Sequence, residues 1–284
     1  MSTDLKKLTQ LYDAERVERG SEKAYRRQLY DVADQGYQKS IKLYQSVLGT
    51  EDGKLVNAMR GLGACQIARG RVQDGETTLE LALGIAEKAY YGEHFEVGLV
   101  QHDLGVCYAL QNKWAEAEEC FTKASAILGK CLQKDHRLVL ATTRKLVAVQ
   151  GMQKKYADAE KQLVAALKVA DTALGPAEDL ILDLALVYQA EGKAAEAAGS
   201  YQEAIDRYEQ RSKYPGLIEA MKYYAEFLKA DKKEESERLL RRADLLENSL
   251  PRTEKPHARD PESHWKYLLS SEADMVFPST QVRS

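Results

Sequence analysis

Small and apolar residues recur along the chain at the spacing of helical hairpins. In residues 104–124 they fall mostly three or four positions apart, at Leu104, Gly105, Tyr108, Ala117, Phe121 and Ala124. Because an α-helix makes one turn in about 3.6 residues, this spacing predicts two amphipathic helices. Gly105 and Ala117 are small where the helices must approach closely, and Asn112 stands between them, where a left-handed turn residue is needed.

The same pattern occurs five times, with roughly 38 to 42 residues between successive copies. The position of Gly105 is taken in the other copies by Gly63, Val147, Ala185 and Tyr224. The turn position holds Gly70, Asn112, Lys154, Gly192 and Asp231, of which all but the lysine tolerate a positive φ well. The small position of the second helix holds Gly75, Ala117, Ala159, Ala197 and Ser236, and the large position holds Leu79, Phe121, Leu163, Tyr201 and Leu240.

This periodicity predicts an all-α fold in which helical hairpins stack into an α-solenoid. Residues 1–53 are helical in pattern but fit the repeat poorly, so we expect an N-terminal helical cap there. Its Tyr30, Tyr37 and Tyr44 form a stripe that either packs in the cap or binds a partner. The five hairpins are expected to span residues 54–92, 93–134, 135–176, 177–213 and 214–250.

Residues 251–284 are rich in proline and polar side chains, which predicts a flexible C-terminal tail. Within it, residues 263–277 read SHWKYLLSSEADMVF, with aromatic and aliphatic side chains followed by acidic ones. Three interpretations are open for this segment. It forms a short helix on the last repeat, it has no order, or it mimics a ligand and occupies the groove of its own or a neighbouring chain.

The spacing L-G-x-x-Y followed by A-x-x-x-F-x-x-A in residues 104–124 resembles the tetratricopeptide repeat (TPR). The long period and the joints around His94 and His136 are similar to the repeats of kinesin light chains. The resemblance covers about residues 54–250. It implies a right-handed superhelix of TPR hairpins, in which the first helix of each repeat lines a concave groove.

The resemblance also implies which positions face the groove. The second and fifth positions of the repeats supply our candidate peptide-binding residues, which are Asn57, Arg60, Leu99, His102, Arg144, Leu182 and Met221. At the fifth position the basic Arg60, His102 and Arg144 come first along the chain, and the apolar Leu182 and Met221 follow. Such a groove suits an acidic peptide with an aromatic or aliphatic anchor, because the guanidinium fork of arginine binds carboxylates. The alternative is an ordinary solvated stripe of polar side chains.

The histidines and cysteines have simpler structural explanations than catalysis. His94 and His136 each follow an acidic residue at a predicted helix start, where a side chain can cap free backbone N–H groups. The four cysteines form no C-x-x-C pair, and Cys65 and Cys107 share one repeat position on an apolar helix face. We therefore expect core thiols there, with no metal site and no cofactor.

Composition narrows the functional classes. The formal net charge of −3 over 284 residues argues against nucleic-acid binding. No apolar run approaches the roughly 18 residues of a membrane span, and residues 1–10 are polar, so we expect a cytoplasmic protein without membrane contact. No phosphate-binding loop or nucleophile motif is present, and we expect no enzyme and no catalytic residues.

The leading hypothesis is a non-catalytic scaffold that binds an extended peptide or partner segment in its groove. A ligand- or peptide-sensing signalling regulator and a permanent structural subunit of a larger complex are the alternatives.

Overall fold

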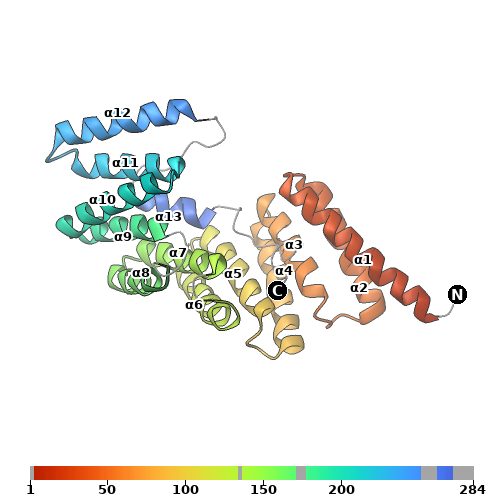
Figure 1. Cartoon of the computed structure of the whole chain (residues 1–284). Helices are drawn as coiled ribbons and strands as arrows, with labels where there is room; N and C mark the ends of the chain where they lie inside the picture. The colour runs from red at the N-terminus through yellow and green to blue at the C-terminus, as the bar shows by residue number, and fades with distance from the viewer. Residues whose placement is uncertain (1–2, 134–135, 171–176, 251–260, 271–284) are drawn as a thin grey trace. The chain divides into compact units, whose positions relative to one another are not determined.

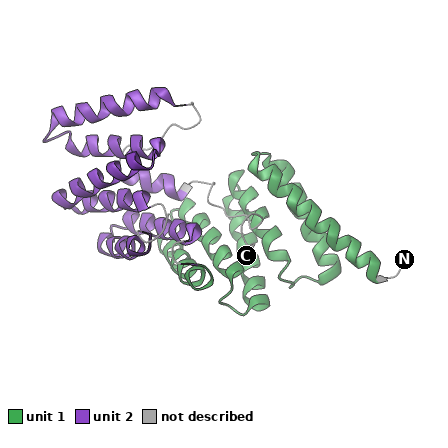
Figure 2. Ribbon diagram, viewed as in Figure 1, with its two compact units in different colours: residues 1–132, 271–284 green, residues 133–270 purple. Residues whose placement is uncertain are grey.

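The computed structural model describes residues 3–133, 136–170, 177–250 and 261–270, and these form thirteen α-helices without a strand (Figure 1). The chain divides into two compact units at residues 132 and 133 (Figure 2). Unit 1 contains α1 (Thr3–Arg26), α2 (Tyr30–Leu48), α3 (Leu55–Ala68), α4 (Val72–Tyr90), α5 (Phe95–Leu110) and α6 (Trp114–Cys131). Unit 2 contains α7 (Arg137–Met152), α8 (Tyr156–Ala170), α9 (Ala177–Glu191), α10 (Ala194–Gln210), α11 (Tyr214–Leu228), α12 (Lys233–Ser249) and α13 (Pro261–Ser270).

Unit 1 is a stack of three helical hairpins. The hairpins are α1 with α2, α3 with α4 and α5 with α6, and each packs on the next through α2 with α3 and α4 with α5. The first hairpin corresponds to the predicted N-terminal helical pair. Tyr37 and Tyr44 of the tyrosine stripe are buried in this packing, and Ser40 Oγ donates to the carbonyl of Ala14 at 2.9 Å.

The small repeat positions are where the helices of a hairpin approach, as the sequence predicts. A Cβ atom on Gly105 would lie 2.7 Å from Cε1 of Phe121, and one on Gly63 would lie 2.8 Å from Cγ of Leu79. Such distances are too short for two carbon atoms, so only glycine fits without displacing the large side chain. Ala117 is fully buried at the equivalent face of α6.

The turns inside the hairpins follow the predicted register with one exception. Gly70, Asn112, Lys154 and Gly192 have φ angles of 76°, 58°, 60° and 85°. Asp231 is not among the residues with positive φ, so the last hairpin turns in another way. There, the backbone N–H groups of both Asp231 and Lys232 donate to the carbonyl of Leu228.

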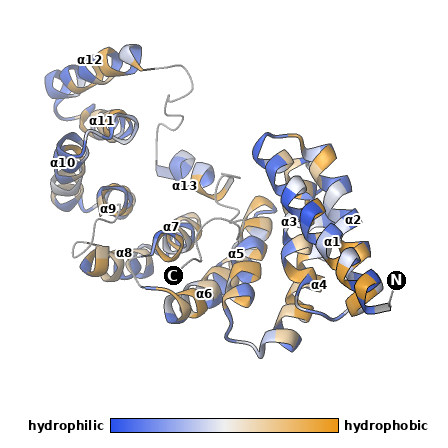
Figure 3. Ribbon diagram, turned by 45° about the vertical axis from the view of Figure 1, so that its right-hand side comes forward, coloured by the Kyte–Doolittle hydropathy of each residue, from blue (hydrophilic) through white to orange (hydrophobic). Residues whose placement is uncertain are grey.

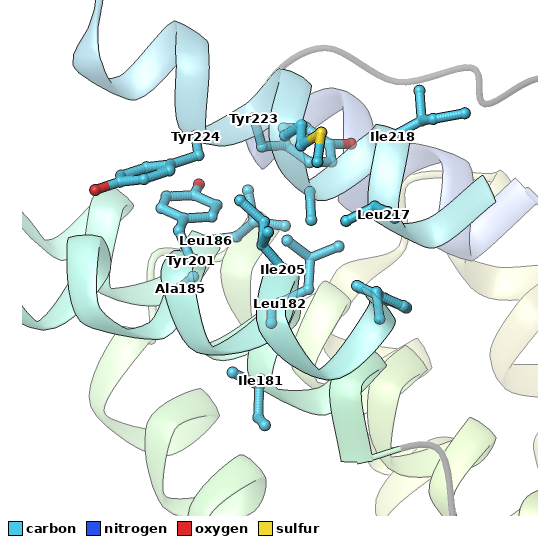
Figure 4. Close-up of a cluster of buried hydrophobic side chains, with 14 of the residues drawn as sticks. Ile181, Leu182, Ala185, Leu186, Tyr201, Ile205, Leu217, Ile218, Tyr223 and Tyr224 are labelled. Atoms are coloured by element: carbon cyan, nitrogen blue, oxygen red, sulfur yellow. The ribbon is translucent and has the colours of Figure 1, made fainter. Parts of the chain in front are cut away.

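Unit 2 contains three more hairpins and one additional helix. The hairpins α7–α8, α9–α10 and α11–α12 pack in sequence. A hydrophobic core cluster joins α9, α10 and α11 through side chains that include Leu182, Met221 and the stacked rings of Tyr201 and Tyr224 (Figure 4). The additional helix, α13, lies on the side of the first helices of the hairpins, while α8, α10 and α12 lie farther from it (Figure 3).

The last hairpin corrects one predicted core position. Leu240, expected to be the large buried residue of α12, is 39% exposed. Leu239 instead packs partly against the core cluster, in line with the buried Ser236 and Ala243 on the same helix face. Leu239 lies three residues and Leu240 four residues beyond Ser236, and both spacings fall on one helix face, so the repeat pattern alone does not decide which of the two leucines faces the core. The helices that the structure describes include none that is both long and apolar enough to span a membrane.

Candidate functional site

The structure divides the seven predicted groove residues between the two units. Asn57 and Arg60 lie on α3, and Leu99 and His102 on α5, all in unit 1. Unit 2 holds the other three, which are Arg144 on α7, Leu182 on α9 and Met221 on α11. Asn57 is half-buried, the Arg144 side chain is 20% exposed, and the remaining five are buried.

The two arginines bridge the first helices of successive repeats. Arg60 Nε on α3 donates to Asp103 Oδ2 on α5 at 2.6 Å. In unit 2, Arg144 Nη2 on α7 donates to Asp183 Oδ1 on α9 at 3.0 Å. Each arginine holds the fifth position of its repeat and each aspartate the sixth position of the next. Each arginine charge is therefore compensated by a carboxylate, which lowers the net positive charge of these faces.

The apolar candidates and His102 belong to the interior of the hairpins. The His102 imidazole meets the ring of Phe121 on α6 edge to face, with centroids 5.6 Å apart. Leu182 and Met221 are members of the core cluster, and Leu99 is fully buried on α5. These side chains can shape a binding face from beneath.

One face of unit 2 receives α13. We call this surface the α13-binding face and define it by Lys145 and Gly151 of α7, Asp183 of α9, and Glu219 and Tyr223 of α11. It lies on the first helices of the hairpins, which the sequence analysis predicts to line the groove. Residues 261–270 of the predicted tail form the helix that occupies it, and the rest of that tail lies outside the described residues.

The polar centre of the α13-binding face is a buried network around His264. Its Nε2 lies 2.9 Å from Asp183 Oδ1, and its Nδ1 lies 3.0 Å from the Tyr223 hydroxyl and 3.5 Å from Glu219 Oε1. Asp183 also accepts hydrogen bonds from Arg144 of α7. His264 therefore joins α13 to α9 and α11, and Asp183 joins this network to α7.

The protonation of this network follows from its charges. Burial lowers the pKa of the His264 imidazole, but hydrogen bonds and charges from Asp183 and Glu219 outweigh burial, and the pKa is raised above its ordinary value. Burial raises the pKa of Asp183, but the Arg144 guanidinium and His264 lower this pKa by more than burial raises it. The net pKa lies below its ordinary value, and the carboxyl stays ionised. A protonated imidazole and an ionised carboxylate form a charge-assisted pair.

The second part of the contact is apolar. Trp265 is buried against α7, where a Cβ on Gly151 would lie 2.7 Å from its Cδ2 atom. The ring of Tyr156 on α8 lies 6.3 Å from the indole, measured between centroids. At the other end of α13, the Lys145 ammonium donates to the carbonyl of Leu268 at 2.6 Å. A cation at this end satisfies a carbonyl that a helix terminus leaves open.

The histidines and cysteines singled out in the sequence have the structural roles that we predict. His94 and His136 cap α5 and α7, where their Nδ1 atoms accept from the N–H groups of Glu96 and Leu138 at 3.5 and 3.2 Å. Cys65 and Cys107 are buried, and burial raises the pKa of each thiol to about 12. Within the described ranges, no group of three or more His, Cys, Asp or Glu side chains is arranged to hold a metal ion.

The aspartate partners and a second set of ion pairs between the hairpins are not among the sequence-based predictions. Lys113, at the start of α6, contacts Glu76 of α4 at 3.0 Å, and Lys193, at the start of α10, contacts Glu160 of α8 at 2.7 Å. Arg71 contacts Asp34 of α2 in the same way. The sequence carries a signal for these ion pairs, because one repeat position is acidic and another is basic. The acidic position holds Asp34, Glu76, Glu118 and Glu160. The basic position holds Arg71, Lys113, Lys155 and Lys193.

Comparisons with known proteins agree with this architecture. The tetratricopeptide-repeat family model matches residues 65–130 and 96–172. A comparison with curated proteins found no match. Among solved structures, the kinesin-light-chain-type TPR-like repeats of Podosopora anserina are 22% identical, with a TM-score of 0.61, over 69% of this chain and 96% of that one.

Two other solved structures extend over more of the chain. BtubC (BKLC) from P. vanneervenii is 15% identical, with a TM-score of 0.62, over 89% of this chain and 95% of that one. A Rap protein complexed with competence and sporulation factor is 16% identical, with a TM-score of 0.53, over 84% of this chain and 65% of that one. At these identities the likeness concerns the fold. Together with the family match and the recurring hairpins, it shows that the chain contains tetratricopeptide repeats and has an all-α solenoid fold similar to that of kinesin-light-chain-like repeat proteins.

Proposed function

We propose that this protein is a non-catalytic scaffold that binds an extended peptide or a segment of a partner protein on the faces of its first repeat helices. The tetratricopeptide-repeat fold supports a role in protein interaction in general. The observation that carries the more specific proposal is that α13 is seated on α7, α9 and α11. In unit 2 this face holds a segment that belongs to none of its hairpins.

Unit 1 has the same polar device on the equivalent helices. Arg60 and Asp103 stand at the repeat positions of Arg144 and Asp183, and the second pair contacts the seated segment through Asp183. By this equivalence, we infer that the face formed by α3 and α5 binds a partner segment. The half-buried Asn57 would contact it, and the buried Arg60–Asp103 pair would lie beneath this contact.

The interior residues would act by supporting these contacts. Leu99 and His102 would fix the surface of unit 1 from beneath, and Leu182 and Met221 would do so in unit 2. Because Arg60 and Arg144 are each neutralised by an aspartate, we expect an aromatic or aliphatic anchor to supply most of the affinity. An acidic flank on the peptide would add a smaller, salt-dependent contribution.

The structural neighbours are compatible with this proposal. The Rap structure is a complex with competence and sporulation factor, so a protein of similar fold binds another molecule.

A photo-cross-linking experiment tests the location of the binding face in unit 1. Short peptides would first be selected from a displayed random library on the full chain. A photoreactive amino acid would then be placed at Asn57, and in a control at Leu81, which is 60% exposed on α4. We expect selected peptides to cross-link at Asn57 and not at Leu81. Cross-linking at Leu81 alone, or binding without any cross-link at Asn57, would contradict the proposal.

A further inference from the structure

The helix α13 is amphipathic, and its contact face carries one imidazole and three large apolar side chains. His264, Trp265, Leu268 and Leu269 are all buried, whereas Glu262, Lys266 and Tyr267 are exposed. Residues three and four positions apart lie on one face of a helix, which explains why these four act together. Their order along the helix is an imidazole, then an indole, then two leucines one turn later.

The α13-binding face has the opposite charge to the imidazole. Around His264 stand Asp183 and Glu219, and Asp179 lies 3.7 Å from Arg144, measured between Oδ2 and Nη1. Three carboxylates and one guanidinium therefore lie around this end of the surface. A cation brought by a docking helix reduces the imbalance, whereas an acidic side chain at the same place would increase it.

The apolar end of the face is equally selective. Gly151 leaves room for the flat indole of Trp265 against the backbone of α7, and any larger residue would meet the ring. Lys145 then binds the carbonyl of Leu268, a contact that a helix provides and an extended strand at the same depth would not reproduce. The face is therefore shaped for a helix with a large aromatic anchor.

The helix α13 depends on its contact with α7 and α9 for its helical state, as a bound peptide would. It has ten residues, and isolated helices shorter than about 12 to 15 residues are marginal in water. It packs on α7 and α9, which are distant in sequence, and α12, the helix that precedes it in the chain, makes no comparable contact with it. Its helical state is thus linked to its docking, and another helix with the same side chains can compete for the same face.

We propose that the α13-binding face is a recognition site for an amphipathic helix of a partner protein, which presents an imidazole or another cation directly before a tryptophan and two leucines one turn later. In this chain, α13 is the resident competitor. The inference deepens the proposed function, since it names the partner chemistry for unit 2. It differs from the proposal for unit 1, in which an acidic flank of the partner segment adds affinity.

The test uses a fluorescent peptide with the α13 sequence, residues 261–270, and the full-length chain. Replacing Trp265 with alanine in the chain weakens the resident competitor, and Lys266→Ala is the matched control, because Lys266 is exposed on the same helix. We expect the peptide to bind the Trp265→Ala chain about tenfold or more tightly than the wild type or the Lys266→Ala chain, because a tethered competitor acts at high effective concentration. Equal affinity for all three chains, or no binding to a Trp265→Ala chain with an intact helical spectrum, would overturn the proposal.

Variants of the peptide and of the face test the chemistry. Replacing the histidine of the peptide with alanine should weaken binding about tenfold, and replacing it with lysine should weaken it less. In the Trp265→Ala chain, Asp183→Asn should remove the distinction between the histidine and alanine peptides. Tight binding of a peptide with glutamate at this place would refute the cationic requirement.

A second measurement keeps the test decisive if the Trp265→Ala chain does not fold. In the wild-type chain, excess α13 peptide should speed amide hydrogen exchange in residues 261–270, since displacement exposes that helix. Unchanged exchange at saturating peptide would overturn the proposal. If the helix peptide fails here while selected peptides still cross-link at Asn57, the unit 2 site is refuted and the proposed function stands.

Discussion

Lys154 has a backbone conformation that lysine rarely adopts. Its φ is 60°, in the left-handed region, at the turn position that Gly70 and Gly192 occupy in other hairpins. A side chain with a Cβ costs roughly 1–2 kcal/mol in this region, which glycine avoids at a smaller entropic cost. We predict that Lys154→Gly raises the free energy of unfolding by about 0.5–1 kcal/mol.

Urea denaturation would measure this change. The control is Lys161→Gly at an exposed position in the interior of α8, where glycine should lower the free energy of unfolding by about 1 kcal/mol. A loss of stability in both variants would show that the turn at Lys154 is not strained.

The protonation of His264 makes the docking of α13 depend on pH. The groups that face this network are Arg144 and Lys145 of α7, Asp179 and Asp183 of α9, Tyr208 of α10, and Glu219 and Tyr223 of α11. The pKa of His264 is raised when docked, so the imidazolium stabilises docking fully below the ordinary pKa of 6.5. This contribution is lost as the pH rises through the raised pKa, while Asp183 stays ionised.

We therefore predict that α13 docks more weakly as the pH rises above this range. Tryptophan emission of a Trp114→Phe chain, which keeps Trp265 as its single tryptophan, should shift to longer wavelength on that rise. The same chain with His264→Gln should show no such titration. A shift in the opposite direction, towards stronger docking at high pH, would contradict the assigned role of the imidazolium.

At the residue scale, local roles were predictable and partners across repeats were not. His94 and His136 act on backbone groups two residues away, and the sequence therefore predicts their capping role. Arg60 and Arg144 were expected to face a ligand, but their aspartates come from the next repeat. Such a pair becomes visible only when the fifth position of one repeat is compared with the sixth position of the next. The charge of a single arginine does not indicate that its partner lies there.

The hairpin elements depend on small residues at the helix contacts. Ala117 of α6 is fully buried in its hairpin with α5. We predict that Ala117→Leu costs about 1–3 kcal/mol of stability, because the added carbons overpack the contact between the two helices. Thermal unfolding would measure the loss. Ala115→Leu on the exposed face of the same helix is the control and should change little. Equal effects of the two would contradict the predicted packing.

The sequence predicts the elements where they pair with their chain neighbours. The period of the small positions indicates hairpins α3–α4 through α11–α12, and in the structure these helices pack together in the same pairs. In α12, Leu239 rather than Leu240 faces the core, a one-residue difference that two adjacent leucines leave open. For residues 263–277 the sequence leaves three interpretations open. It does not decide where α13 lies, because a ten-residue helix can dock on any distant surface that fits it.

At the scale of the whole molecule, both units are built from hairpins whose first helices carry the candidate binding faces. The sequence predicts one array of five repeats with a cap and a tail, and the structure groups the same hairpins into two compact units. In unit 2 the face holds α13, and in unit 1 the equivalent Arg60–Asp103 pair marks the corresponding surface. Binding of a segment on first helices is thus the central claim for this protein.

Acrylamide quenching of Trp265 tests this claim most directly. In the Trp114→Phe chain, the account predicts that Trp265 is quenched several-fold less in the native chain than in urea, since its side chain is buried between α13 and α7. The complementary Trp265→Phe chain reports through Trp114 that the repeats remain folded. Quenching of Trp265 in the native chain as strong as in urea would show that the face of unit 2 holds no segment, and would contradict the account.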